Sequence, residues 1–575
     1  MKRFLVYLAI VPLFFVFGCN GGSSFNINDS VGSSPSNPCK DKAVIDTTTG
    51  SFCAASDSPG NVNAYKGIKY AKGGQAFRWQ SPIAADDFTT PKEAGTFGDV
   101  CAQVDTSILG VDALAALTDD SNISLKGSED CLFLNVYAPK EVQNEKKPVM
   151  VWIPGGAFLL GTGSDVTFDP KHIVELEDVV VVTLNYRLGI FGFLNLPEAY
   201  KKEGVSSANF GLQDQAMVIK WVYDNIEHFG GDKEKITIMG ESAGSMSVGF
   251  HLVNNDSPTS DYFRAAIMQS PYMGFPVKTD EHAQEVGSFT ANLMIEACKD
   301  DNVSDPIQCL YETLSTEDIV VNTEVQGLIY YLFKTLTSGS FSNIFPYEPY
   351  IDNDMVKSNL IDSEIKKPLL IGNNKSESNF LLALIQPYHD LSTESAYESF
   401  LDIMFKDLNK TTLLQMYPYE SEEPMKGLEN LISDYAFNCA SQTFIETDTF
   451  ADVYIYKFYF ESGFNRWKDG TMCDAPAVCH AADIPYTFHQ FYYSDDTPIP
   501  NVSNNEKNFS VAMIARWSEF IKTLAMSGFA PYNPSVENFI EMNNTAPYFF
   551  EQRGTFAKEH NCKFWSDYYK VQKNP

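Results

Sequence analysis

Basic residues are scarce in this chain. Its 575 residues include 42 lysines and arginines against 74 aspartates and glutamates, so the formal net charge is −32. A surface of this sign repels phosphate backbones, which argues against nucleic acid as a partner. The acidic residues are scattered along the sequence and favour solubility through self-repulsion. With 44% hydrophobic and 13% aromatic residues, the composition still predicts a folded protein with a large core.

The chain also lacks a hydrophobic run long enough to span a bilayer. An apolar stretch at residues 4–17 follows two basic residues and is too short for that purpose. It ends in a Gly-Cys pair at Cys19, and this arrangement resembles a bacterial lipoprotein signal, in which the cysteine carries lipid. We therefore expect a signal peptide at 1–18, lipidation of Cys19 and a flexible tether at 19–38. The alternative is a plain secretory signal with an incidental cysteine.

No two cysteines have the C-x-x-C spacing that is typical of zinc sites, and no metal or organic cofactor is expected. The sequence contains eleven cysteines. If Cys19 carries lipid, ten remain, and an even number in an exported chain predicts five disulfides.

Short apolar segments alternate with helical patterns along the rest of the chain. Strands are expected at residues 149–153, 179–184, 236–239, 369–372 and 453–458, and a helix is expected at 213–229. Strands that alternate with helices predict an α/β fold, with a large, mainly parallel sheet covered by helices on both faces. The stretch 279–362 has a helical but irregular pattern and is expected to form a cap or lateral segment. Without repeats or a second linker, residues 39–575 are expected to form one domain.

The motif Gly240-x-Ser242-x-Gly244 follows one of these strands directly. Small residues on both sides of the serine allow a sharp strand-to-helix turn that exposes its hydroxyl, as in a nucleophile elbow. The motif alone would also suit a serine in an ordinary tight turn. Its place after a strand and before a helix favours the nucleophile.

A nucleophilic serine needs a base, and the chain has eight histidines. In α/β hydrolases the order along the chain is nucleophile, acid, histidine. His251 and His282 follow Ser242 too closely to leave room for a strand that carries the acid. His480 lies in a loop after a predicted strand, where catalytic loops belong. On order alone three further histidines stay open, namely His389, His489 and His560.

Several motifs together carry a resemblance to a known family. Residues 229–244 look like the serine signature of type-B carboxylesterases, and residues 129–136 look like their second signature. Residues 185–189 and 209–215 are also similar to that family, and the similarity spans roughly residues 44–565. The resemblance implies an α/β-hydrolase fold and the hydrolysis of small-molecule carboxylic esters through an acyl-enzyme, without a cofactor.

The family pattern also implies the remaining catalytic residues. The acid is Glu377, which on its own would be interpreted as a solvated loop carboxylate, and the base is His480. The backbone N–H groups of Gly156, Ala157 and Ala243 correspond to the family's oxyanion hole. Ala157 stands where the family usually has the third glycine of a Gly-Gly-Gly-Phe turn.

Three disulfides and a buried ion pair between Arg78 and Glu129 complete the resemblance, and two further disulfides are expected. Three bridges match recurring family bridges, and the remaining four cysteines are paired by proximity. The family bridges are Cys101–Cys131, Cys298–Cys309 and Cys439–Cys562, and the pairs by proximity are Cys39–Cys53 and Cys473–Cys479.

The family also contains non-catalytic adhesion proteins, so an adhesion or binding protein on the same fold is the alternative function. That branch has lost the catalytic serine, whereas this chain retains Ser242, and the sequence therefore favours an enzyme. Amides or peptides are a third class of substrate. Cholinesterases carry a cation-binding tryptophan in the loop closed by their first disulfide, but residues 102–130 contain no Trp, Tyr or Phe. We therefore expect no preference for choline esters.

Overall fold

The computed structural model describes most of the chain after the predicted tether. It covers residues 39–573 except 41, 43, 57, 59, 106–122, 141–144, 203, 206, 207, 300–302, 380, 383–390, 448, 468–472 and 474–477. The predicted signal peptide, the lipidation site at Cys19 and the tether lie outside the described residues. Within these ranges, no helix combines the length and apolar character that a membrane crossing requires.

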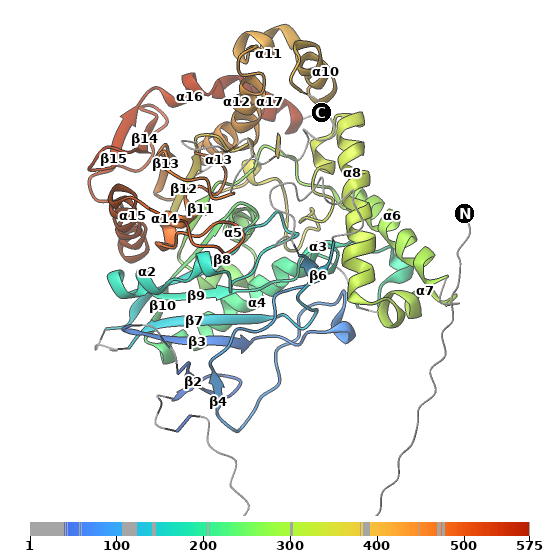
Figure 1. Ribbon diagram of the computed structural model, residues 1–575, viewed down its shortest axis with the longest axis vertical. Helices are drawn as coiled ribbons and strands as arrows, with labels where there is room; N and C mark the ends of the chain where they lie inside the picture. Colours follow the sequence, from blue (N-terminus) through green and yellow to red (C-terminus); the bar gives the residue numbers. More distant parts are fainter. Residues whose placement is uncertain are drawn as a thin grey trace, which may run out of the picture.

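A ten-stranded sheet forms the centre of the molecule (Figure 1). Its order is β15-β14-β13-β12-β11-β10-β8-β9-β7-β3, and six of its nine neighbouring pairs are parallel. The strands are β3 (Val62–Lys69), β7 (Phe133–Pro139), β8 (Lys147–Ile153), β9 (Val180–Leu184), β10 (Gly231–Glu241), β11 (Ala265–Gln269), β12 (Leu369–Asn374), β13 (Val453–Phe458), β14 (Asn538–Met542) and β15 (Phe549–Arg553). The predicted α/β fold with a mainly parallel sheet is confirmed.

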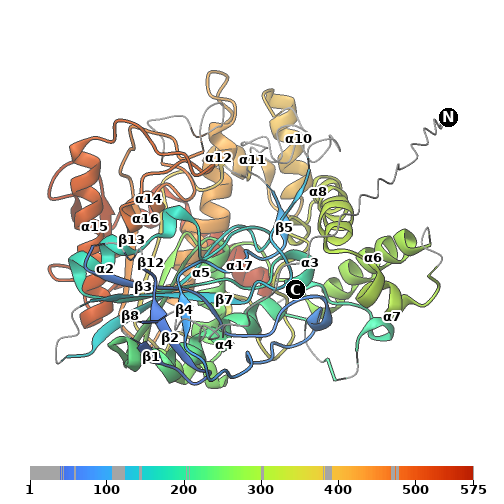
Figure 2. The ribbon, with the colours of Figure 1, turned by 60° about the horizontal axis from the view of Figure 1, so that its bottom comes forward.

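Alternating side chains of the central strands enter two separate apolar cores, because successive residues of a strand point to opposite faces. Val149 and Val151 of β8 pack with α4 (Phe210–Asn225) and α5 (Ala243–Val253). Met150 and Trp152 pack on the other face with α2 (Lys171–Glu177), α14 (Ile484–Phe488) and α15 (Asn504–Thr523). In Figure 2 the strands lie between α2 and α4. Helices therefore cover both faces, as the near-continuous apolar strands require.

Two smaller sheets precede the nucleophile strand. One contains β1 (Val44–Asp46), β2 (Ser51–Ala54) and β4 (Lys92–Ala94), and the other pairs β5 (Gln103–Val104) with β6 (Leu125–Lys126).

One predicted helix differs from the structure at both ends. The apolar spacing predicts a helix at 213–229, but α4 begins at Phe210 and ends at Asn225. The last four predicted residues form the 3-10 turn η6 (Ile226–Phe229), which ends at Gly230 with φ 84°. The earlier start buries Phe210 and Leu212.

The segment expected to be a cap or lateral segment lies beside the sheet, on the right in Figure 1. It contains α6 (Asp280–Cys298), α7 (Pro306–Gln308) and α8 (Val325–Ser338), which are connected in part by π-helical turns. Its apolar side chains form a third core with α3 (Gly189–Phe193). This segment is therefore lateral.

All five predicted disulfides are present, and the Arg78–Glu129 pair is buried. Arg78 binds both carboxylate oxygens of Glu129, at 2.8 and 2.5 Å. The third guanidinium nitrogen of Arg78 donates to the carbonyl of Leu310, which ties the lateral segment to the pair. Five disulfides are typical of an exported protein.

Candidate active site

Ser242 occupies a sharp turn between β10 and α5. Its backbone has φ 57° and ψ −123°, a conformation that few non-glycine residues adopt. Its N–H donates to the carbonyl of Gln269, 3.0 Å away at the end of β11. A Cβ on Gly244 would lie 2.1 Å from the carbonyl oxygen of Ile153, so only glycine allows α5 to approach β8 this closely. The local geometry is that of a nucleophile elbow.

The structure brings Ser242, His480 and Glu377 into one hydrogen-bonded chain. The Ser242 Oγ lies 2.8 Å from His480 Nε2, and His480 Nδ1 lies 2.6 Å from Glu377 Oε2. The other oxygen of Glu377 accepts a hydrogen bond from the N–H of Asn374, at 2.5 Å. Glu377 is fully buried, which excludes a solvated loop carboxylate at this position. Of the histidines left open by chain order, His389 lies outside the described residues, and among the others His480 is the one that reaches the serine.

Adjacent strands explain why residues far apart in sequence meet here. Glu377 follows β12 and His480 follows β13, and these parallel neighbours end at the same edge of the sheet as β10. An isolated parallel β-bridge between Ser376 and Cys479 joins the two loops. A hydrogen bond from Asn374 Nδ2 to the Cys479 carbonyl, at 2.9 Å, joins them a second time. The Cys473–Cys479 disulfide ends one residue before His480.

Two further carboxyl groups surround His480, and the sequence interpretation did not assign either of them. Glu241 Oε1 lies 3.3 Å from His480 Nε2, and Asp483 is fully buried three residues beyond the histidine. Burial raises the pKa of Glu241 to about 7, and burial with the charge of Glu377 raises the pKa of Asp483 to about 6. Asp483 accepts a hydrogen bond from Gln269 Nε2, at 2.5 Å. Glu241 lies inside the elbow motif, so its position next to Ser242 was a usable signal.

The carboxylates determine the charge of the histidine. Burial lowers the pKa of His480, but Glu241 and Glu377, with a smaller effect of Asp483, hold it above its ordinary value of 6.5. In the neutral ring Nε2 accepts the Ser242 proton and has no hydrogen to donate, and no described residue donates a hydrogen bond to Glu241 Oε1. Once Nε2 is protonated, the same carboxylate stabilises the positive charge.

The three predicted oxyanion donors lie on two sides of the elbow. Gly156 and Ala157 follow β8 with φ of 119° and 55°, and Ala243 is the first residue of α5. Within the described part of the chain their N–H groups donate to no protein acceptor. A Cβ on Gly155 would lie 3.1 Å from the Cβ of Ser242, so the turn after β8 packs directly against the nucleophile. Free N–H groups beside a serine can stabilise the oxyanion of a tetrahedral intermediate.

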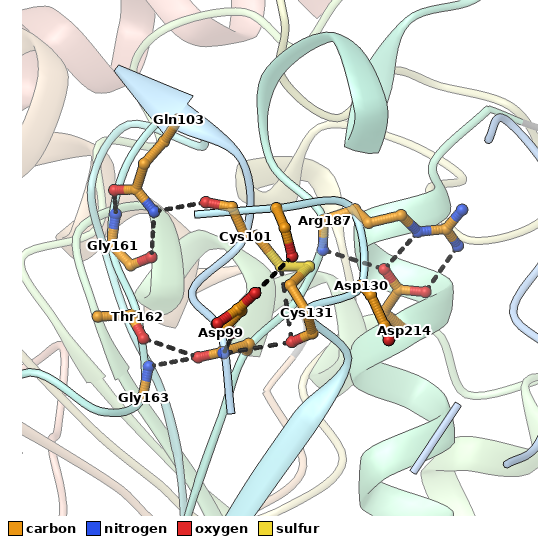
Figure 3. Close-up of a disulfide and its surroundings, with 12 residues drawn as sticks. Asp99, Cys101, Gln103, Asp130, Cys131, Gly161, Thr162, Gly163, Arg187 and Asp214 are labelled. Atoms are coloured by element: carbon orange, nitrogen blue, oxygen red, sulfur yellow. Dashed lines mark hydrogen bonds and ion pairs between the residues drawn. A yellow bond between two sulfur atoms is a disulfide. The ribbon is translucent and has the colours of Figure 1, made fainter. Parts of the chain in front are cut away.

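The Cys101–Cys131 disulfide and its neighbours brace this turn (Figure 3). The side chain of Gln103 donates to the carbonyl of Gly161, at 3.1 Å, and accepts from its N–H, at 3.0 Å. A Cβ on Gly161 would lie 2.3 Å from the carbonyl oxygen of Gly155, so Gly161 packs against the start of the turn at 154–161, which we call the oxyanion turn, and β5 holds this turn in place. Asn185 donates to the Cys131 carbonyl, at 3.2 Å, and accepts from the N–H of Gly163, at 2.9 Å.

Across the described ranges, no group of three or more His, Cys, Asp or Glu residues is arranged to hold a metal ion. The fold and the hydrogen-bonded serine together define a serine hydrolase of the α/β-hydrolase class. The sequence pattern of the carboxylesterase family matches residues 42–565, and the chain belongs to this family. It is therefore a hydrolase of carboxylic esters, with small-molecule esters as substrates.

Similar proteins span most of the chain. "Crystal protein" of Dictyostelium discoideum is 30% identical over 69% of this chain and 68% of its own length. "Acetylcholinesterase 1" of Caenorhabditis elegans is 27% identical over 88% of this chain and 84% of its own length. "Para-nitrobenzyl esterase" of Bacillus subtilis (strain 168) is 28% identical, with coverage of 80% and 86%.

Proposed function

We propose that Ser242 is the nucleophile of an ester hydrolase in which His480 transfers protons and Glu377 orients the histidine. His480 Nε2 takes the hydroxyl proton as Ser242 Oγ attacks the ester carbonyl. The histidine then returns this proton to the leaving alcohol, and an acyl-enzyme on Ser242 remains. Water, deprotonated by the same nitrogen, releases the acid. The 2.8 Å contact between Oγ and Nε2 on a nucleophile elbow carries this proposal.

Glu377 and Glu241 have different roles in this scheme. Glu377 accepts the Nδ1 proton of His480 and thereby leaves Nε2 free as the base. Glu241 donates nothing to the neutral ring but attracts the imidazolium that forms during attack. Glu377 therefore sets the tautomer of His480, and Glu241 lowers the energy of the state in which His480 is charged.

The N–H groups of Gly156, Ala157 and Ala243 serve as the oxyanion hole in this proposal. These groups have no acceptor among the residues that the structure describes, and this, with their place around the elbow, supports the role. The N-terminus of α5 adds a partial positive charge at Ala243. Loss of one oxyanion donor typically costs about 2.7–4 kcal/mol of transition-state stabilisation.

A matched pair of serine variants tests the nucleophile. Ser242→Ala should reduce hydrolysis of 4-nitrophenyl acetate to near background, because the hydrogen-bonded set of Ser242, His480 and Glu377 then has no hydroxyl to attack the ester carbonyl. Ser245 lies one turn along α5, is fully buried and has no hydrogen-bond partner among the described residues. Ser245→Ala should therefore retain activity, and both variants should unfold at the wild-type temperature. Substantial turnover by a folded Ser242→Ala protein would refute the assignment.

For the whole chain, we propose an exported, lipid-anchored esterase of a bacterial cell envelope. A signal peptide at 1–18, a lipidated Cys19 and a tether at 19–38 would precede the hydrolase domain at 39–575. The short apolar run before Cys19 supports the anchor, and the five disulfides support export. Small-molecule esters, and no nucleic acid, are its partners in this scheme.

Cell fractionation tests the anchor. Cys19→Ser should release the protein from the membrane fraction without a change in specific activity, because the tether separates the anchor from the hydrolase domain. A wild-type protein that is wholly soluble outside the cell would contradict the proposal.

A further inference from the structure

Tyr272 combines deep burial with an unused hydroxyl. It lies three residues after the end of β11 and is 2% exposed. Among the described residues its OH has no hydrogen-bond partner. Buried hydroxyls in folded proteins are nearly always paired, and an unpaired one requires an explanation. A ligand that supplies the missing acceptor is one such explanation.

The ring of Tyr272 belongs to an aromatic wall that begins at the catalytic histidine. Phe437 lies 5.6 Å from the His480 ring, centroid to centroid, and Tyr272 lies 6.3 Å from Phe437. On its other side Tyr272 lies 5.6 Å from Phe345. Phenylalanine rings offer no strong acceptor to the hydroxyl. Tyr272 is thus a hydrogen-bond donor in an otherwise apolar wall.

The backbone places Tyr272 close to the reacting serine, because the carbonyl of Gln269, three residues before Tyr272, accepts a hydrogen bond from the N–H of Ser242 at 3.0 Å. Burial raises the pKa of Tyr272 well above its ordinary value, and Glu348, Tyr186 and Glu241 raise it further. Glu241 precedes Ser242, and the Tyr186 hydroxyl donates to the carbonyl of Pro154 at the start of the oxyanion turn, 3.0 Å away. The phenol therefore keeps its proton throughout the working pH range and remains a donor.

The charged neighbour of Tyr272 already has a partner. One oxygen of Glu348 accepts from Lys278, whose ammonium group also donates to the Phe345 carbonyl. This buried pair fixes the backbone of the wall at Phe345, while the Tyr272 hydroxyl has no partner in the described part of the chain.

We propose that Tyr272 is a specificity-determining residue that donates a hydrogen bond to an oxygen of the bound ester other than the scissile group. The preferred substrates are esters with an additional acceptor, such as an ether, hydroxyl or carbonyl oxygen, in the acyl or the alcohol half. This inference rests on the proposed role of Ser242, because the wall is placed relative to that reacting centre.

Ester pairs that differ by one atom test the inference. In the acyl arm, 4-nitrophenyl pentanoate is compared with the ethoxyacetate and 3-methoxypropanoate esters, in which oxygen replaces one methylene. In the alcohol arm, butyl acetate is compared with 2-methoxyethyl acetate. For each ester the ratio of kcat/KM between wild type and Tyr272→Phe cancels the intrinsic reactivity of the substrate. The arm that responds identifies the half of the substrate that Tyr272 contacts.

We expect Tyr272→Phe to lower kcat/KM between about three- and tenfold for at least one oxygen-containing ester, as for loss of one neutral hydrogen bond. The hydrocarbon esters should stay within about twofold of wild type. The variant should remain folded, because its hydroxyl pairs with no described group. An equal fall for all esters would indicate a water-mediated or structural role and would overturn the inference, as would no change for any ester.

Tyr186→Phe provides the matched control. Its hydroxyl already donates to the Pro154 carbonyl, so any effect on kcat/KM should be the same for the oxygen-containing and hydrocarbon esters.

If Ser242→Ala retains turnover, the assignment of Ser242 as the nucleophile fails. A selective response of Tyr272→Phe in an enzyme that depends on Ser242 supports both assignments.

Discussion

His480 makes two kinds of contact, polar contacts through its ring nitrogens and aromatic packing against its ring. On one side Ser242 and Glu377 bind the ring nitrogens through polar contacts of 2.8 and 2.6 Å. Away from these contacts Phe437 packs against the His480 ring and Tyr272 packs against Phe437, and the only polar side-chain atom of this pair, the Tyr272 hydroxyl, is unpaired among the described residues. The first side has groups suited to bond breaking, and the second has a surface suited to substrate selection. Changes on the first side should affect all esters, whereas changes on the second should alter their ranking.

Different parts of the fold place the two sides. Ser242, Glu377 and His480 follow strands of one sheet, and their meeting point is determined by parallel pairing. Phe437 comes from the π-helical turn η12 (Asp434–Asn438), and Tyr272 comes from the loop after β11.

Removal of the base should give the largest effect on the catalytic side. His480→Ala should lower kcat for every ester by about 10⁶-fold, as in serine hydrolases that lose this residue. Tyr272→Phe, measured with the same esters, should not approach this loss. Steady-state rates with neutral and oxygen-containing esters check the contrast, and a strong dependence of the His480→Ala effect on the ester would break it.

Loss of the Glu377 carboxylate should lower kcat strongly, but less than loss of His480. Glu377→Ala should lower kcat by about 10⁴-fold, because the histidine loses its fixed tautomer while the nucleophile and base remain. Glu559→Ala, a change at an exposed helix residue far along the chain, is the control for expression and folding. A Glu377→Ala enzyme within tenfold of wild type would assign the acid elsewhere.

Acidification should inactivate the enzyme as His480 takes up a proton. Because the pKa of His480 lies above its ordinary value of 6.5, kcat/KM should fall as the pH decreases through a midpoint above that value. Glu241→Gln removes a carboxylate that raises this pKa, so the midpoint should move to lower pH. The pH profile of kcat/KM for both proteins measures the effect. An unchanged or higher midpoint in the variant would contradict the electrostatic role of Glu241.

The smallest expected difference in kcat/KM is between a cationic ester and a neutral ester of the same size. Residues 102–130 contain no aromatic side chain to hold a quaternary ammonium group, despite the similarity to an acetylcholinesterase. A butyrylcholine ester should therefore be hydrolysed no more efficiently than its uncharged 3,3-dimethylbutyl counterpart. A preference for choline of about tenfold or more, equal to roughly 1.4 kcal/mol, would reveal a cation site in the aromatic wall or elsewhere.

The catalytic side was largely predictable because short motifs and strand order determine it. Ser242 lies within a contiguous motif after a strand, and chain order left few histidines as its base. The family resemblance then indicated Glu377 and His480, which the structure joins. It also indicated the Cys101–Cys131 disulfide, whereas the Cys473–Cys479 disulfide before His480 was predicted from the proximity of the two cysteines.

The aromatic wall was not predictable in the same way. Phe437, Tyr272 and Phe345 belong to segments with no shared motif, and their contacts depend on side-chain packing between distant parts of the chain. The carboxyl groups of Glu241 and Asp483 were missed for a related reason. Their influence on His480 arises from burial, which residue spacing does not reveal.

In the proposed mechanism Ser242 forms the covalent intermediate. The most direct measurement is intact-protein and peptide mass spectrometry after reaction with an organophosphate such as diethyl 4-nitrophenyl phosphate. The account predicts one diethylphosphoryl group per chain, located on Ser242, with loss of activity in proportion to labelling and no label in Ser242→Ala. An unlabelled wild-type protein that still hydrolyses esters, or a label that persists in Ser242→Ala, would contradict it.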